Sequence, residues 1–300
     1  MKITTSRPFS DTNDPGFMLA LIGAARPVEQ LTDDPSRVDL HELLQSPVVQ
    51  SRTRLWFDGE DLLAFALVDE YNNLLFDCSP AHLESLGDEI VQWGVDCLKP
   101  GGARTLDANC RASDRSRIAF LEGHGFERKS EETISMLRDL ARPIPEADLP
   151  AGFAIRCVTG EEEAPALAAL HRAAFGSDYM TTENRLAMMR VPEYDPTLDL
   201  VVAAPDRSLA AYCMCSISEE ENRATGRREG QTDPIATHPR FQKMGLARAL
   251  LFKGLHLLRE RGMDFAGLGT SSENIAMQKT AESVGFYVTL RKIWFEKEIV

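Results

Sequence analysis

One stretch of the sequence, HPRFQKMGLARALL at residues 238–251, decides the fold. It follows a short strand-like run and opens an apolar pattern of helical period that ends at Gly262. The first amides of a helix lack intrahelical partners, and the helix dipole adds about half a positive charge there. Gly245 would let the backbone approach a ligand oxygen without a Cβ in the way. A strand, a polar turn and a long helix therefore predict an anion-binding turn.

The turn differs from the two best-known phosphate-binding motifs. Neither the dinucleotide fingerprint G-x-G-x-x-G nor the P-loop ending Gly-Lys-Ser/Thr occurs in it. Lys243, with Arg240 and Arg248 nearby, adds positive charge. A single glycine at a helix start is also common without any ligand, so the turn by itself leaves the type of site open.

Length and composition indicate two soluble domains. The chain has 300 residues, of which 43% are hydrophobic, and this is long for one compact core. Its six cysteines have neither disulfide-like nor zinc-like spacing, and no metal-binding constellation is recognisable. The N-terminus lacks an apolar signal region, and no run approaches the ~18 apolar residues of a membrane span. We therefore expect a cytoplasmic protein without a metal or a membrane partner.

Charge restricts the class of partner. The net charge of −13 argues against a nucleic-acid partner, because phosphate backbones bind basic surfaces. Residues 1–150 contain 15 Lys and Arg against 26 Asp and Glu, whereas residues 151–300 contain 18 against 20. An anionic ligand is therefore expected in the second half.

The two halves repeat one order of elements. The segment DLARPIPEADLPAG (139–152) has three prolines and no periodicity, so it predicts a linker at 144–151 between domains 1–143 and 152–300. Each half then reads as strands, a long helix, a strand, a shorter helix and a last strand. Asp114 precedes the pair Gly125-Phe126 by eleven positions, as Asn274 precedes Gly285-Phe286, 160 residues later. This match favours a duplication.

The opening stretch also carries a family resemblance. Residues 242–247 (QKMGLA) match the Gln/Arg-x-x-Gly-x-Gly/Ala signature of the GCN5-related N-acetyltransferases, and the segment from Asn274 to Phe286 is similar to a later motif of that family. The likeness covers residues 150–300, and over 1–143 it rests on element order and the repeat. It implies an α/β (α+β) fold of two tandem domains, each a mixed, mostly antiparallel twisted sheet flanked by helices.

The resemblance implies acetyl-CoA as co-substrate, held mainly by backbone. Amides of the turn would hold the pyrophosphate, the strand at 235–237 would hold the pantetheine, and the asparagine would contact the pantetheine or ribose. The implied binding residues are Ile235, Ala236, Thr237, Gln242, Lys243, Met244, Gly245, Leu246, Ala247, Asn274 and Met277. In the first half, acidic Glu84 and Asp88 stand where a pyrophosphate would lie. We therefore expect domain 1–143 to be degenerate and not to bind CoA.

The acid and base that this family often uses are missing. Ala281 stands where a tyrosine acid is usual, and Gln231 where a glutamate base is usual. Asp233 lies two residues on, so the strand period would place it on the same face as Gln231. Ser272, at the end of the fifth strand, could replace the missing hydroxyl. The catalytic candidates are therefore Asp233, Gln231 and Ser272. Residues with a possible role but a simpler structural explanation are His171, His238, Tyr287 and the carboxylate of Val300.

Three functions remain open from the sequence. The first is transfer of an acetyl group to the amine of a small molecule by direct attack, in a monomer or homodimer. The second is a non-catalytic protein that binds or senses acyl-CoA, since the usual acid and base are absent. The third is an interaction scaffold without CoA, which the intact turn at 242–247 argues against.

Overall fold

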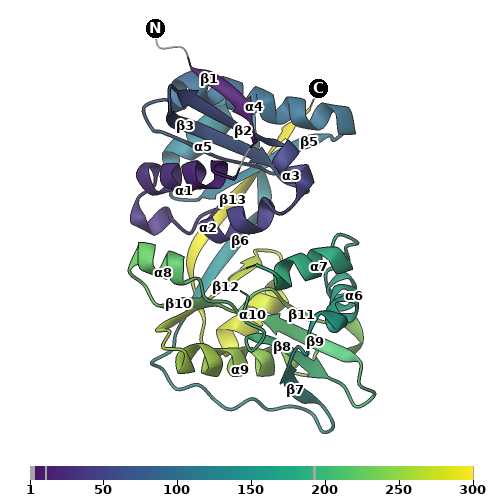
Figure 1. Cartoon of the computed structure of the whole chain (residues 1–300). Helices are drawn as coiled ribbons and strands as arrows, with labels where there is room; N and C mark the ends of the chain where they lie inside the picture. The colour runs from purple at the N-terminus through teal and green to yellow at the C-terminus, as the bar shows by residue number, and fades with distance from the viewer. Residues whose placement is uncertain (1–3, 11, 192–193, 300) are drawn as a thin grey trace. The chain divides into compact units, whose positions relative to one another are not determined.

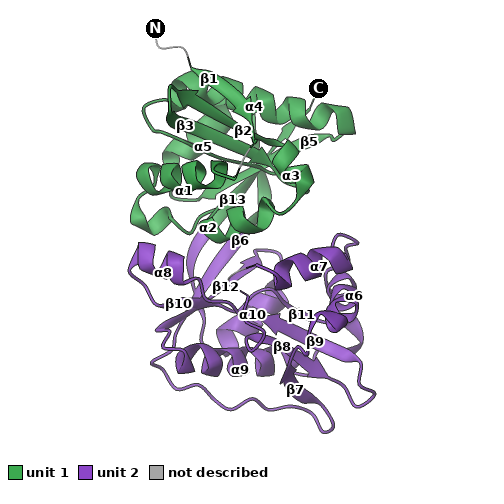
Figure 2. Cartoon of the chain, viewed as in Figure 1, with its two compact units in different colours: residues 1–132, 292–300 green, residues 133–291 purple. Residues whose placement is uncertain are grey.

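The computed structural model describes residues 4–10, 12–191 and 194–299. These residues form two compact units, which Figure 2 colours separately. Unit 1 contains residues 1–132 together with residues 292–300, and unit 2 contains residues 133–291. Unit 1 is thus built from both ends of the chain.

Unit 1 contains a four-stranded antiparallel sheet in the order β1-β2-β3-β4 (Figure 1). Because successive strand side chains point to opposite faces, Leu55 and Phe65 pack with the helices α1 and α2, whereas Trp56 and Ala66 pack with α4. The elements in chain order are β1 Thr5–Pro8, α1 Asp14–Ala25, α2 Arg37–Leu43, α3 Pro47–Ser51, β2 Thr53–Asp58, β3 Asp61–Val68, β4 Leu74–Cys78, α4 Leu83–Leu98, β5 Thr105–Arg111 and α5 Arg115–Gly123.

Unit 2 repeats this plan with its own four-stranded antiparallel sheet, in the order β11-β9-β8-β7. The elements that follow α5 along the chain are β6 Glu127–Asp139, β7 Ala154–Cys157, α6 Ala164–Phe175, α7 Thr182–Met189, β8 Asp199–Ala203, β9 Leu209–Met214, α8 Glu219–Thr225, β10 Glu229–Gln231, β11 Ile235–Thr237, α9 Leu246–Glu260, β12 Phe265–Ser271, α10 Ile275–Ser283 and β13 Tyr287–Glu298. The predicted α/β class, with two copies of a mostly antiparallel fold, is confirmed.

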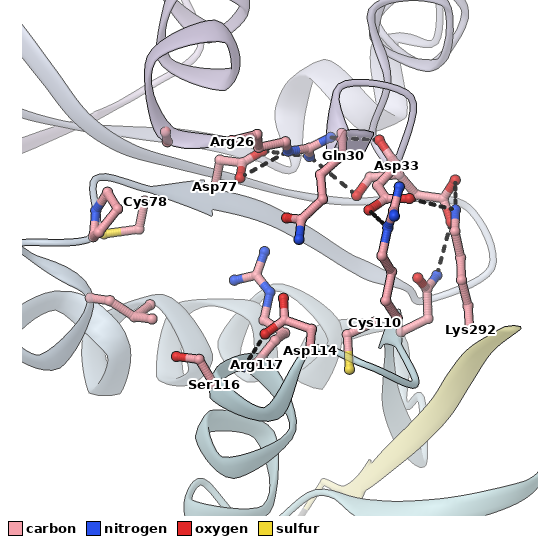
Figure 3. A pocket seen from close by; sticks show the side chains of 16 residues that line it. Arg26, Gln30, Asp33, Asp77, Cys78, Cys110, Asp114, Ser116, Arg117 and Lys292 are labelled. Carbon is pink, nitrogen blue, oxygen red and sulfur yellow. Dashed lines mark hydrogen bonds and ion pairs between the residues drawn. The ribbon is translucent and has the colours of Figure 1, made fainter. Parts of the chain in front are cut away.

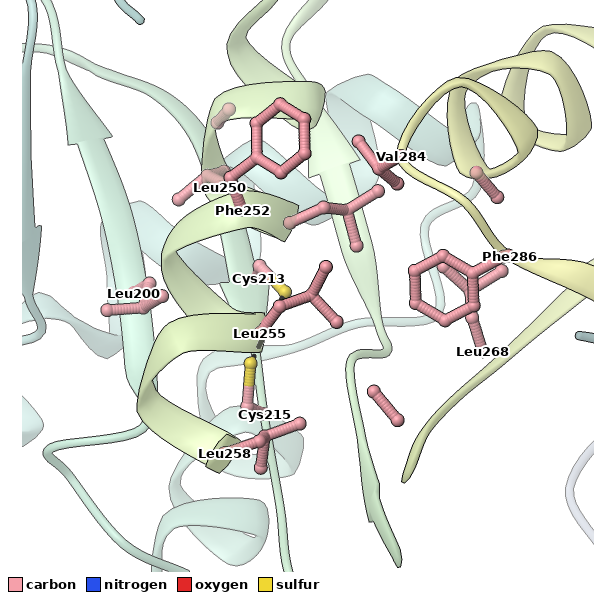
Figure 4. Packing of buried hydrophobic residues seen from close by; sticks show 14 of the residues in the cluster. Leu200, Cys213, Cys215, Leu250, Phe252, Leu255, Leu258, Leu268, Val284 and Phe286 are labelled. Atoms are coloured by element: carbon pink, nitrogen blue, oxygen red, sulfur yellow. Dashed lines mark hydrogen bonds between the residues drawn. The ribbon is translucent and has the colours of Figure 1, made fainter. Parts of the chain in front are cut away.

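Helix α9 supplies much of the core of unit 2 (Figure 4). Its leucines Leu250, Leu255 and Leu258 are fully buried at helical spacing. They pack with Leu200 of β8 and Leu268 of β12, among others. The helix ends one residue before Arg261, and Gly262 then adopts a positive φ of 80°. The apolar face and the glycine stop that the sequence predicts for this helix are confirmed.

The long strands β6 and β13 each pair with a strand from the other half of the sequence, in a sheet separate from the two four-stranded ones. The five-stranded sheet has the order β10-β12-β6-β13-β5. Within unit 2, residues 133–139 of β6 pair antiparallel with all of β12. Within unit 1, residues 292–298 of β13 pair antiparallel with all of β5. Each half of the sequence therefore supplies a strand that pairs within the opposite unit.

The exchanged strands also bind the shorter helices. Arg138 of β6 donates through Nε to the carbonyl of Val284 at 2.8 Å, just after α10 in unit 2. Lys297 of β13 donates to the carbonyl of His124 at 2.7 Å, just after α5 in unit 1. The last carbonyls of a helix have no intrahelical donor, so a cation there is favourable. The two units thus close these helix ends in the same way.

The repeat seen in the sequence has the same structural meaning in both units. Asp114 caps α5 by accepting from the amide of Arg117 at 2.9 Å, and Asn274 caps α10 by accepting from the amide of Met277 at 3.1 Å. Gly125 and Gly285 follow these helices with φ of 77° and 91°, a conformation that suits glycine. The eleven-residue spacing therefore spans one capped helix and the glycine that follows it.

The compact units differ from the predicted ranges 1–143 and 152–300. Residues 133–143 lie in unit 2, and residues 292–300 lie in unit 1. The predicted linker at 144–151 forms neither helix nor strand, but Ile144 is buried in the core of unit 2 and Leu149 packs against it. Prolines prevent regular structure in this segment, but its apolar side chains still pack. No helix in the described part of the chain is long and apolar enough to cross a membrane.

The strand exchange predicts that a substitution near the C-terminus destabilises unit 1. Phe295 of β13 is fully buried in the core cluster that contains Trp56, Ile90 and Phe126. Phe295→Ala should lower the free energy of unfolding by about 3–5 kcal/mol through lost burial and the cavity left behind. Glu298→Ala, an exposed position on the same strand, should change it by less than about 0.5 kcal/mol.

Urea denaturation measures this difference, and hydrogen exchange locates it. Amides of β3 in unit 1 should exchange faster in Phe295→Ala. If unit 1 were as protected in that variant as in the Glu298→Ala control, the assignment of the last strand to unit 1 would be wrong.

Candidate active site

The chain between β10 and β11 changes from one sheet to the other. Residues 229–231 of β10 pair in parallel with β12, whereas residues 235–237 of β11 pair with β9. In the described residues, no pairing joins β11 to β12. The chain thus runs beside β12 along β10 and then separates from it. This leaves the edge of β11 on the side of β12 unpaired.

The hydrogen bonds of β11 show which backbone groups lie on that edge. Pro234 O accepts from Met214 N at 3.1 Å, and His238 N donates to Ala210 O at 2.9 Å, so these groups face β9. Because backbone groups alternate in direction along a strand, those of Ile235 and Thr237 point away from β9. They are available to an extended ligand in the opening.

The turn after β11 presents a series of backbone amides. A short 3-10 helix, Pro239–Phe241, is capped by the ring of His238, which accepts from the amide of Arg240 at 3.2 Å. Lys243 and Gly245 then adopt positive φ of 62° and 80° before α9 begins. In the described residues, the amides of 243–248 have no hydrogen-bond acceptor, and the first bond back to the turn is from Ala249 to Gly245 O.

The surroundings of these amides fit an anion. Gly245 is exposed, and a Cβ built there would meet no atom within 4 Å. Lys243, Arg240 and Arg248 are exposed on or next to the turn. Leu246, the first residue of α9, is buried and fixes the helix start in the core. The turn therefore combines a helix N-terminus, free amides and positive charge on a rigid base.

The N-terminus of α10 follows the end of β12. Asn274 uses its side-chain oxygen as the helix cap, which leaves the side-chain NH₂ group for another partner. The side-chain amide of Gln278 donates to the carbonyls of Ser271 and Ser272, each at 3.0 Å. These bonds fix the strand end that carries Ser272, and Met277 is partly buried on the first turn of the helix.

Gln231 and Asp233 lie over one face of β12. A Cβ on Gly267 would meet the Gln231 side chain at 2.2 Å, and a Cβ on Gly269 would meet Asp233 Oδ2 at 3.1 Å. Asp233 Oδ2 accepts from Gly269 N at 2.9 Å, at the point where β11 separates from β12. The shared face predicted from the strand period is therefore confirmed. Ala281 is fully buried in the core and carries no acid group.

The structure gives the other sequence candidates these positions. His171 of α6 is half-buried, its Nδ1 lies 2.6 Å from Tyr212 Oη, and its ring packs against Phe175. Tyr287 is exposed at the start of β13. Val300 lies outside the described residues.

Sequence reasoning missed a buried ion pair that joins α7 to β8. Arg185 and Asp199 form an ion pair with side-chain exposures of 3% and 0%, and Tyr194 Oη donates to Asp199 at 2.8 Å. Arg185 also lies over the ring of Tyr212, the partner of His171. Asp199 opens strand β8, and a charge at the start of an apolar run was the available signal.

Unit 1 has the same separation of strands but a different turn. Asn73 and Asp107 form a parallel bridge, after which β4 and β5 separate. Only residues 79–82 join β4 to α4, without glycine, whereas residues 238–245 join β11 to α9. The guanidinium of Arg117 donates to Phe76 O of β4 at 2.7 Å, in the opening itself. In the part of unit 1 that the structure describes, the long amide-bearing turn is therefore absent, and Arg117 takes one carbonyl on the edge of β4.

Among the described residues, no group of three or more His, Cys, Asp or Glu is placed to hold a metal ion. Cys78 and Cys110 lie in unit 1, and burial raises the pKa of each thiol to about 11. Both are therefore neutral at physiological pH.

Comparison with known proteins agrees with this geometry. Residues 164–286 match the model of the acetyltransferase (GNAT) family. A mycothiol acetyltransferase of Nocardia farcinica is 31% identical over 210 residues, 67% of this chain and 66% of the relative. Another, of Thermobispora bispora, is 28% identical over 250 residues, 79% of this chain and 80% of the relative.

Solved structures share the fold over nearly the whole chain. A GCN5-related N-acetyltransferase from Sphaerobacter thermophilus has a TM-score of 0.72 at 20% identity and covers 99% of this chain and 96% of its own. A tandem GNAT protein from the clavulanic acid biosynthesis pathway has a TM-score of 0.73 at 16% identity, with 99% and 98% covered. The fold is thus that of tandem GNAT proteins, and the sequence matches identify an acetyltransferase. The chain belongs to the GNAT family of N-acetyltransferases.

The environment of His171 predicts a depressed pKa. Burial lowers its pKa below the usual 6.5, and the charge of Arg185 adds to this effect. The folded state then binds fewer protons than the unfolded state between the two pKa values, so the free energy of unfolding should fall as pH decreases through 6.5. NMR titration of the imidazole in the folded protein should give a midpoint below 6.5, and a midpoint at or above 6.5 would contradict this account. His171→Gln should remove this contribution to the pH dependence of stability.

Proposed function

We propose that unit 2 binds acetyl-CoA and transfers its acetyl group to the amine of a small molecule. The observation that carries the proposal is the turn 242–247, whose free amides lie at the N-terminus of α9 and directly follow the unpaired edge of β11. A pyrophosphate fits the first feature, and an amide-bearing pantetheine chain fits the second. Acetyl-CoA contains both groups.

The proposed contacts follow the chain. Amides from Lys243 to Ala247 hold the pyrophosphate, with Gln242 at the turn entrance. The backbone of Ile235 and Thr237 pairs with the pantetheine amides as an added strand would, and Ala236 stays paired with β9. The side-chain NH₂ of Asn274 and the partly buried Met277 complete the site near α10. Acetyl-CoA supplies the activated thioester.

Transfer needs few side chains in this arrangement. The acceptor nitrogen attacks the thioester carbonyl, the C–N bond forms and the C–S bond breaks, and the amine's proton ends on the departing sulfur. Backbone amides of β11 can stabilise negative charge on the carbonyl oxygen. Holding both reactants in place supplies much of the rate, so the absence of a tyrosine at Ala281 is compatible with catalysis.

Asp233 is the proposed proton acceptor, acting through water, or the group that orients the amine. Its carboxylate lies at the root of the opening, where Oδ2 accepts from Gly269 N. Gln231 is an amide and cannot take a proton, so we assign it to positioning. Ser272, at the end of β12, is the proposed hydroxyl near the sulfur.

The acceptor is proposed only as a class, a small primary amine. Two of the similar proteins are named mycothiol acetyltransferase. The unacetylated form of mycothiol is therefore the first acceptor to test. Unit 1, with its short turn and with Arg117 in the opening, is proposed not to bind CoA.

Gly245→Glu should abolish CoA binding. A carboxylate would enter the amide-lined turn and repel the pyrophosphate, and the residue would also be strained at φ 80°. We expect the Kd for CoA to rise at least about tenfold, because favourable contacts with the phosphates are replaced by charge repulsion.

Gly262→Glu is the matched control, because Gly262 has the same φ of 80° and equally open space at the other end of α9. Isothermal titration with CoA and acetyl-CoA gives the affinities. No binding to the wild type, or equal loss in both variants, would refute the proposed turn.

The variant Asp233→Asn tests whether the protein is an enzyme or a CoA-binding sensor. Asparagine keeps an oxygen for Gly269 N but cannot accept the amine's proton. With unacetylated mycothiol and a panel of primary amines, CoA release should fall at least about tenfold in kcat, while the affinity for acetyl-CoA stays the same. The acidic limb of the pH profile of kcat/KM should also be lost.

Ser272→Ala, assayed alongside, tests the proposed hydroxyl. An unchanged kcat and pH profile in Asp233→Asn would remove Asp233 from the mechanism. Saturable acetyl-CoA binding without CoA release on any amine would instead favour the sensor.

A further inference from the structure

Unit 1 contains a pocket of about 190 Å³ in the opening between β4 and β5 (Figure 3). Its walls come from the end of α1 and the loop after it, the ends of both strands, and the first turn of α5. Arg26, Gln30, Asp77, Asn109 and Arg117 are among the residues that line it. The pocket occupies the position that corresponds to the proposed pantetheine site of unit 2.

The duplication explains why the two openings differ. Asp114 and Asn274 are equivalent caps, so Arg117 of unit 1 corresponds to Met277 of unit 2. Arg117 Nη2 donates to Phe76 O at 2.7 Å, and its guanidinium lies 3.8 Å from the centre of the Phe76 ring. This side chain takes the strand carbonyl that a pantetheine amide would need, and it leaves the rest of the pocket empty of the chain's own side chains.

Most charges around the pocket neutralise one another. Arg26 forms an ion pair with Asp77 at 2.5 Å, and Arg111 pairs with Asp33 at 2.5 Å. Lys292 of β13 pairs with Asp34 at 2.9 Å. Each of these three cations therefore has its own carboxylate.

Arg117 is the exception among the described cations of the pocket. In the described residues no carboxylate lies within ion-pair distance of its guanidinium, and the charges of Asp77 and Asp114 act on it only from farther away. Figure 3 shows the guanidinium of Arg117 and the side-chain amide of Gln30 directed into the pocket. Burial lowers the pKa of Arg117, which indicates that its charge is poorly solvated. A guanidinium has five donors, and a single carbonyl uses only one of them.

We propose that the unit 1 pocket binds a small oxyanion, a carboxylate or a phosphate group of a metabolite, through the guanidinium of Arg117 and the amide of Gln30. Guanidinium groups match both anions in bidentate geometry. Arg117 takes the strand carbonyl that a pantetheine amide would need, so this ligand is distinct from the proposed acetyl donor of unit 2. The opening that unit 2 offers to pantetheine thus serves in unit 1 as a second, separate binding site.

The test uses the full chain with Gly245→Glu, so that the turn of unit 2 cannot contribute an anion site. Isothermal titration at constant ionic strength compares inorganic phosphate with succinate, and chloride serves as the reference anion. One of the two oxyanions should bind saturably. Arg117→Met, which introduces the residue found at the equivalent position in unit 2, should weaken its Kd at least about tenfold.

Arg115→Met is the matched control, because Arg115 is exposed on the same helix turn and does not line the pocket. It should leave the Kd unchanged. Absence of binding by both oxyanions, or equal binding after Arg117→Met, would overturn the proposal. If circular dichroism shows that Arg117→Met is unfolded, Arg117→Lys decides instead, since it keeps the charge but loses the bidentate fork and should still weaken binding. The outcome is independent of CoA binding in unit 2, because every titration is made with that turn blocked.

Discussion

The exchange of strands between the halves of the chain is the constraint on which both units depend. Residues 133–139 pair with β12 in unit 2, and residues 292–298 pair with β5 in unit 1. Arg138 and Lys297, carried on these strands, then close the C-terminal ends of α10 and α5. A strand without its neighbour exposes unpaired backbone groups, so neither half can form its full sheet alone. The fold is duplicated along the sequence, but the stability of each unit depends on a strand from the other half of the chain.

The separation of paired strands is the second shared feature, and the two units use it differently. In unit 2 the edge of β11 stays free and leads into a turn with unpaired amides. In unit 1 the connection is shorter, and Arg117 occupies the equivalent opening. A change of one helix residue and the loss of part of a loop therefore alter what the same backbone framework can accept.

The local features of the site could be predicted because they depend on neighbours in sequence. The helix from Leu246 and its glycine stop at Gly262 follow from periodicity and capping rules, and the structure has both. The shared face of Gln231 and Asp233 follows from the strand period. The linker predicted at 144–151 forms neither helix nor strand for the same reason, since prolines act locally.

The unit boundaries and the pocket of unit 1 depend on contacts distant in sequence. The alternating strand pattern is compatible with burial of Phe295, but it does not indicate which half of the chain buries it. The register of β13 with β5 decides this. The pairing of Arg185 with Asp199 and of His171 with Tyr212 likewise joins separate elements. The sequence by itself determined the long helix α9, the repeated order of elements and the turn before that helix. Only the tertiary structure decided which strand completes which sheet and which cation is left without a carboxylate, because strand pairing and ion pairing are set by distance in space.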